Sequence, residues 1–174
     1  LFFVVFFLSP RINTYLSETE INNSKIQFSK IVSIINSKSR TIEDKDKLLN
    51  EIQLLLTSTT LGKTGYIYIL DNTGKIIFDP SGEFQSEEIS KITLPSANNS
   101  LLFNEIKNAY SKRQVLEYDW NKNYDPFNYT YKKISWIEYN QKMDWYIVSS
   151  IYKEDFTGFI DGINSLILNI SMVL

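Results

Sequence analysis

The sequence of 174 residues contains no cysteine and no histidine, and each absence excludes a group of functions. Without cysteine, the chain has no disulfides, no thiolate nucleophile and no zinc site of the finger or ribbon type. Without histidine, it lacks the usual general base near neutral pH and the Ser-His-Asp type of mechanism. We therefore predict that this region is not an enzyme and that it holds no cofactor and no metal.

The charged residues give no sign of a nucleic-acid partner. Lys and Arg together number 18 and Asp and Glu number 20, so the net charge is -2. A chain without excess positive charge is not generally attracted to a phosphate backbone. The length suits one domain with helical extensions rather than two separate cores.

Both ends of the chain are apolar. Residues 1–8 read LFFVVFFL, and residues 162–174 carry no charge. Each is shorter than the roughly 20 residues that cross a bilayer. Their pairing around a polar middle predicts that 1–10 is the end of a first transmembrane helix and that 157–174 is an exit helix leading into a second. Alternatives are a signal-peptide core or a buried strand at the start, and an amphipathic helix at the end.

Residues 11–57 are predicted to be a helical region because apolar residues recur there at helical spacing. The apolar stripe weakens across 36–40, and Thr41 followed by Asp44 is typical of a new helix start. We expect one long helix and then a shorter one. A long helix leaving a membrane segment also favours pairing with a second copy, so we expect a homodimer.

Beyond Gly62 the pattern changes to that of strands. Strands are predicted at 66–70, 75–79, 115–120, 129–139 and 145–152, with residues 86–111 mostly helical and Ser100 as a possible N-cap. The expected fold is α+β, with a long N-terminal helix and a second helix packed on a five-stranded antiparallel sheet and a helical C-terminal exit. The short helices and the 121–128 loop would line the other face and leave a concavity there.

Four segments occur in an order and spacing that resemble a known family. They are the hairpin GYIYILDNTGKII at 65–77, and the strands YDW at 118–120, KISWI at 133–137 and DWYIVSSIY at 144–152. Together they resemble the single Cache domain, a PAS-like extracytoplasmic sensor of bacterial chemoreceptors, histidine kinases and cyclic-nucleotide signalling enzymes. The resemblance places the PAS-like Cache sensor domain at 58–156.

The resemblance implies a function and a location. It implies that the domain binds a small metabolite, commonly a carboxylate in this family, and passes the signal through the membrane. The flanking helices would anchor it in the bacterial inner membrane, with the domain in the periplasm or outside the cell. The chain departs from the family pattern at Asp79, where histidine is frequent, at Ser149 and Ser150, and at 94–99. A ligand-free module for protein interaction or dimerisation is therefore the alternative.

Three residues are the leading ligand-binding candidates. Tyr118 and Trp120 share one face of their strand because side chains alternate, and their O–H and N–H groups need partners if buried. Packing in the core is the alternative for both. Lys133 coincides with the family's motif lysine and would direct its ammonium group at a ligand carboxylate. The alternative for Lys133 is a surface position, with its stem lying along the sheet.

Three further residues are weaker candidates. Strand alternation also suggests Trp136 and Tyr68 for the pocket, although both suit a core equally well. Asp79 stands where the family often has histidine, so it is a candidate to accept a hydrogen bond from the ligand. Stabilisation of the turn before Pro80 is the competing role for Asp79.

Overall fold

The computed structural model describes residues 9–84, 89–122, 125 and 128–156. Helix α1 spans Ser9–Thr41 and helix α2 spans Lys45–Ser58. Asp44 is the N-cap of α2, and its carboxylate accepts a hydrogen bond of 2.8 Å from the backbone N–H of Lys47. The predicted pair of helices is confirmed, with the break at 42–44, slightly later than the weakened stripe.

The sheet is antiparallel throughout, and its strands follow the order β2-β1-β8-β6-β5. The strands are β1 (Tyr66–Asp71), β2 (Ile76–Phe78), β5 (Leu116–Trp120), β6 (Tyr131–Ser135), β7 (Ile137–Asn140) and β8 (Trp145–Tyr152). Strand β7 pairs with β8 in the same register as β6, so the predicted strand 129–139 is interrupted only at Trp136. This interruption gives six strands instead of the predicted five.

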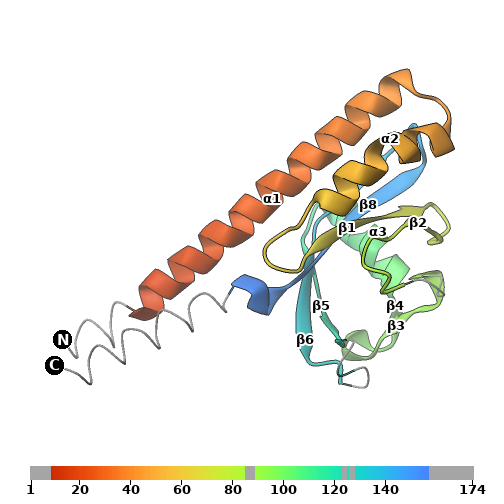
Figure 1. Cartoon of the computed structure of the whole chain (residues 1–174). Coiled ribbons are helices and arrows are strands. Elements are labelled where there is room, and N and C mark those ends of the chain that lie inside the picture. The colour runs from red at the N-terminus through yellow and green to blue at the C-terminus, as the bar shows by residue number, and fades with distance from the viewer. Residues whose placement is uncertain (1–8, 85–88, 123–124, 126–127, 157–174) are drawn as a thin grey trace.

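The two faces of the sheet pack against different layers (Figure 1). Helices α1 and α2 cover one face, where Ile67, Ile69 and Ile147 join Phe28 and Ile52 in one core. Helix α3 (Leu102–Lys112) and the small sheet of β3 (Thr93–Leu94) and β4 (Ser100–Leu101) cover the other. The α+β class and the long helix across the sheet are confirmed.

The segment before α3 differs from the prediction. Instead of a mostly helical 86–111, the described part contains the 3-10 helix η2 (Ile89–Lys91), strand β3, the 3-10 helix η3 (Pro95–Ala97) and strand β4. Asn98 and Asn99 adopt left-handed backbone conformations with φ of 52° and 57°, which end any helix there. Ser100 lies in β4 and is not the N-cap of α3, which is Leu101.

The last described element is the 3-10 helix η4 (Lys153–Phe156). The predicted membrane segments at 1–10 and 157–174 lie almost wholly outside the described residues, which begin at Ser9 and stop at Phe156. Within the described ranges, no helix combines the length and the apolar character that a bilayer span requires.

Candidate functional site

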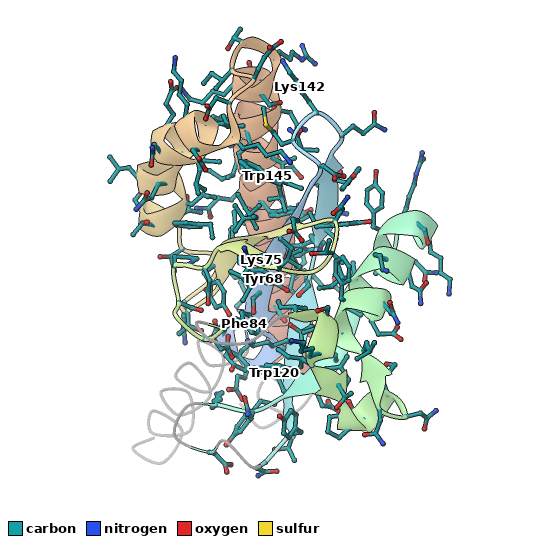
Figure 2. The ribbon with its side chains drawn as sticks, turned by 90° about the vertical axis from the view of Figure 1, so that its right-hand side faces the viewer. Tyr68, Lys75, Phe84, Trp120, Lys142 and Trp145 are labelled. Carbon is teal, nitrogen blue, oxygen red and sulfur yellow. The ribbon has the colours of Figure 1, made fainter. Side chains whose placement is uncertain are left out.

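The face of the sheet beneath α3 carries a row of polar and aromatic side chains. Strand alternation places them together on neighbouring strands, where Tyr66 pairs with Ser150, and Lys133 pairs with both Tyr118 and Tyr152. Figure 2 shows Tyr68, Phe84 and Trp120 following one another down this side of the molecule. The Phe84 ring lies 5.4 Å from that of Tyr68 and 5.8 Å from that of Trp120. The aromatic side chains on this face of the sheet, together with Phe84 from the loop after β2, surround Lys133 in β6; we call them the aromatic wall.

Lys133 is completely buried, with 0% of its surface exposed. Its Nζ lies 2.7 Å and 2.9 Å from the two carboxylate oxygens of Glu83, which belongs to the loop after β2. The ammonium group also faces aromatic rings, at 4.7 Å from the ring centre of Tyr152 and 5.4 Å from that of Trp120. A dehydrated ammonium group surrounded by rings is a strong site for a carboxylate.

Glu83 accepts hydrogen bonds from two more side chains of this wall. The indole N–H of Trp120 donates to Oε1 at 2.5 Å, and the hydroxyl of Tyr66 donates to Oε2. The Glu83 side chain is 13% exposed, whereas Lys133 has no contact with solvent. Lys133, Trp120 and Tyr66 therefore form one donor set, and it is occupied by a carboxylate of the chain itself.

Asp79 holds the loop that presents Glu83. One oxygen of its carboxylate accepts from the backbone N–H of Ser81 at 2.9 Å and from the Ser81 hydroxyl at 2.6 Å. The other oxygen accepts from the backbone N–H of Phe84 at 2.9 Å. In this state Asp79 has the turn-stabilising role that was its alternative interpretation, and it acts on the site through the loop.

Four buried hydroxyl groups lie on the same face of the sheet. Those of Tyr68, Tyr118, Ser135 and Ser150 make no hydrogen bond within the described part of the chain. Ser135 and Ser150 lie near the Tyr118 hydroxyl, but outside hydrogen-bond geometry. A buried polar group without a partner costs free energy, so these groups are places where water or a ligand would be stabilised.

Burial shifts the pKa values in this cluster. Desolvation lowers the pKa of the Lys133 ammonium, and the negative charge of Glu83 opposes that change. Desolvation raises the pKa of the Tyr66 hydroxyl, and the adjacent Glu83 charge raises it further. Both tyrosines deeper in the wall, Tyr68 and Tyr118, also have their pKa raised by burial. The phenols are thus neutral donors at physiological pH.

A cavity of about 300 Å³ adjoins the Glu83 carboxylate. It is lined by Thr64, Tyr66, Ser81, Glu83, Lys122, Tyr152 and Asp155. A larger hollow of about 620 Å³ lies elsewhere, between α1, the end of α3 and β7, and its charged residues Lys25, Arg113 and Glu138 are all exposed. The smaller cavity is the better candidate site because, of the two, it is the one lined by Glu83 and Tyr152, which contact the buried Lys133.

Trp136 does not belong to this cluster. It lies three positions beyond Lys133, and alternation therefore turns it to the opposite face, where its ring is 6.3 Å from that of Phe28 in α1. Trp136 therefore lies apart from Lys133 and lines the larger hollow instead. Tyr68, Tyr118, Trp120 and Lys133 do share the pocket face.

Three residues around Lys133 are not among the candidates predicted from the sequence: Glu83, Tyr66 and Tyr152. Two of them carried a usable signal, since Tyr66 and Tyr152 have the same strand parity as Tyr68 and Ser150. Glu83 carried none, because it belongs to an irregular loop and lies 50 positions from Lys133 in the sequence. Among the described residues, no group of three acidic, histidine or cysteine side chains is placed to hold a metal ion.

A long helix on one face of an antiparallel sheet, with a polar pocket on the other face, defines the class of PAS-like sensor domains. The particular family follows from the sequence: residues 15–173 match the Cache domain, and the chain belongs to that family. No curated protein sequence matches the chain.

Solved structures of chemotaxis and chemosensory proteins are similar to this chain in fold. One is a methyl-accepting chemotaxis protein from Vibrio parahaemolyticus, with 18% identity, a TM-score of 0.63, and coverage of 85% of this chain and 98% of that one. Another is a Cache chemosensory domain described for its carboxylic acid recognition, with 18% identity, a TM-score of 0.59 and coverage of 82% and 97%. A third is the periplasmic sensor domain of a chemotaxis protein, with 18% identity, a TM-score of 0.58 and coverage of 84% and 98%.

Proposed function

We propose that this Cache domain senses a small metabolite that carries a carboxylate, and that Lys133 is the anchor of that group. The observation that carries the proposal is the donor set of Lys133, Trp120 and Tyr66, which already holds one carboxylate in a dehydrated setting. Charge-assisted hydrogen bonds are about twice as strong as neutral ones. The similar Cache domain described for carboxylic acid recognition supports the same ligand class.

The ligand would occupy the cavity beside Glu83 and reach the unpartnered hydroxyls of the sheet. Tyr118 and Tyr68 would offer their unpartnered O–H groups to its polar atoms, and Trp120 would offer the indole N–H that now binds Glu83. Asp79 would act by holding the loop rather than by contacting the ligand.

We further propose that the domain belongs to a receptor of the bacterial inner membrane and lies in the periplasm or outside the cell. Residues 1–10 and 157–174 would be parts of the two membrane helices. Ligand binding shifts an equilibrium between two arrangements only by its difference in affinity for them. The resulting change of conformation would be transmitted out of the domain through α1 and through η4, the last described element before 157–174.

A homodimer through α1 is part of the same proposal. Helix α1 exposes Tyr15, Ile26 and Ile34, at 69%, 45% and 40% of their surfaces. Large apolar side chains left exposed along a helix of 33 residues favour pairing with a second copy.

The test is a titration of the full 174-residue chain with acetate, propionate, lactate and pyruvate at constant ionic strength, with sodium chloride and 1-propanol as controls. We expect at least one acid to raise the melting temperature in a saturable manner, because a ligand that binds only the folded state stabilises it. The variant Lys133→Met should weaken this binding by at least about tenfold.

Lys132→Met is the matched control, because Lys132 is the neighbouring residue on the opposite, exposed face and pairs with Asp119. Its affinity should stay within about twofold of the parent. Equal affinity of the parent and Lys133→Met for the acid would contradict the role of Lys133 as the anchor of the carboxylate.

A second candidate function is a ligand-free module for interaction or dimerisation. It is favoured by one observation: Glu83 already balances the positive charge of Lys133, so no bound anion is needed to neutralise this buried charge. If none of the acids changes the melting temperature at tens of millimolar, this second function replaces the first.

A further inference from the structure

The buried lysine of this domain already holds a carboxylate that belongs to the protein. Both oxygens of Glu83 contact Lys133, and the same two oxygens take the N–H of Trp120 and the O–H of Tyr66. This set of donors saturates a carboxylate, so a ligand carboxylate and Glu83 cannot bind to it fully at the same time.

From this arrangement we propose that Glu83 is a tethered competitor, which occupies the anion site in the free protein and is displaced by the carboxylate of the ligand. The inference rests on the proposed function, since it assigns the regulation of the same site. It predicts that the chain sets its own threshold for ligand concentration.

The two sides of the ion pair are held differently, which makes exchange at this site reasonable. Lys133 lies in β6, between β5 and β8, and has no exposed surface. Glu83 lies in a loop, retains 13% exposure and borders the 300 Å³ cavity. The carboxylate therefore has a route to solvent, whereas the ammonium group has none.

The loop is built to keep Glu83 close even when its carboxylate is displaced. Asp79 binds the N–H groups of Ser81 and Phe84, and the Phe84 ring is buried against Trp120. These contacts anchor residues on both sides of Glu83 and do not involve its carboxylate. A tethered group of this kind competes at an effective concentration in the millimolar range or above.

The competition has a measurable consequence for affinity. A ligand that must displace an internal competitor binds with an apparent dissociation constant equal to its intrinsic constant divided by the fraction of protein in the open form. Removal of the competing carboxylate should therefore strengthen the binding of simple acids, although it removes a charged group from the site. A residue that merely helps to line the pocket would have the opposite effect.

The experiment uses propionate as the probe, because it reproduces the terminal part of a glutamate side chain. Binding to the full chain is measured by calorimetric titration for the parent, Glu83→Ala, Glu83→Gln and the double variant Glu83→Ala with Lys133→Met. We expect Glu83→Ala to bind at least about tenfold more tightly than the parent, Glu83→Gln to lie between them, and the double variant not to bind.

Glu117→Ala is the matched control, because Glu117 is an exposed glutamate in neighbouring β5. Its side chain lies on the face opposite Tyr118 and Trp120, where its carboxylate is 3.4 Å from Nζ of exposed Lys153. Its affinity should equal that of the parent. Glu83→Gln keeps the side-chain volume, so the comparison still decides the matter if Glu83→Ala does not fold.

The indole N–H of Trp120 provides a second readout that needs no affinity. The chain has three tryptophans, so the indole signals in a proton–nitrogen spectrum are few and can be assigned by substitution. The Trp120 signal should shift upfield in Glu83→Ala and return towards its parent position when propionate is added, because a carboxylate again accepts its hydrogen bond.

The possible failures are distinguishable. If the parent and both Glu83 variants bind propionate equally, displacement is overturned while carboxylate sensing stands. The same holds if the variants bind more weakly than the parent. If neither the parent nor any Glu83 variant binds any of the four acids, the displacement and the proposed function both fail.

Discussion

Two aspartates shape successive turns of this domain in the same way. Oδ1 of Asp71 accepts from the N–H and the hydroxyl of Thr73 at 2.8 Å and 2.6 Å, and Oδ1 of Asp79 accepts from the same groups of Ser81. Such local hydrogen bonds are the reason that aspartate is favoured in turns. Asp71 closes the hairpin, and Asp79 positions the carboxylate that occupies the anion site.

Asp79→Ala should loosen the loop that carries Glu83. The change leaves the N–H of buried Phe84 without its partner, so we expect the free energy of unfolding to fall by about 1–3 kcal/mol. Denaturant unfolding measures this loss. Asn72→Ala, an exposed change in the neighbouring turn, should stay within about 0.5 kcal/mol of the parent. A similar effect of both substitutions would deny Asp79 this role.

Asp71 predicts a dependence of stability on pH. Partial burial tends to raise the pKa of Asp71, but hydrogen bonds from Thr73 and from the Lys75 N–H outweigh it and lower the pKa below its usual value. A lowered pKa means that the contribution to stability is present above the unfolded-state value and is lost as the pH falls through the folded-state value. The difference in stability between the parent and Asp71→Asn should therefore be largest near neutral pH and shrink below about pH 4.

Among the elements, the junction between α1 and the turn after β7 is polar although it is buried. The amide group of Asn140 donates to the side-chain oxygen of Asn36 at 2.8 Å and to the Ser39 hydroxyl at 3.0 Å, and its oxygen accepts from the N–H of Met143 at 2.9 Å. One side chain thus joins the far end of the long helix to the sheet.

Asn140→Ala should remove the hydrogen bonds that join α1 to the end of β7. It leaves buried polar groups without partners, so we expect a loss of about 2–3 kcal/mol of stability. Gln141→Ala, at the next and exposed position, is the control and should change stability by less than about 0.5 kcal/mol. Thermal unfolding of the two variants gives the comparison, and equal midpoints would show that the junction contributes nothing.

Regular elements could be predicted from the sequence because their signals are periodic. The strands around Tyr68, Tyr118 and Lys133 follow from alternation, and the same alternation brings these residues to one face. The same alternation places Trp136 on the face opposite Lys133, against Phe28. The segment before α3 was misassigned because the left-handed conformations of Asn98 and Asn99 have no periodic signature. Glu83 reaches the site from a loop, so nothing local in the sequence indicates its partner.

In the molecule as a whole, the candidate site lies next to the segment by which the chain leaves the domain. The cavity is lined by Thr64, just before β1, and by Asp155 in η4. The N–H and hydroxyl of Thr64 both donate to one oxygen of Asp155, at 3.0 Å and 2.7 Å. η4 also lies against α1 (Figure 1). We call the Thr64–Asp155 contact the clasp. A ligand in the cavity would touch this clasp, which joins the start of β1 to η4, and η4 in turn contacts α1.

This arrangement predicts which amide groups respond to a ligand. Saturating propionate should slow hydrogen exchange at Thr64 and in η4 by at least about threefold, because a filled cavity restricts the opening of the clasp. Residues around Asn140, at the other end of β8, should not respond. Asp155→Asn should abolish the response at Thr64, whereas Lys38→Ala, which removes an exposed ion pair with Glu51, should leave it intact. If protection appears only in the loop that carries Glu83, binding stays local, and the signal must leave the domain by another route.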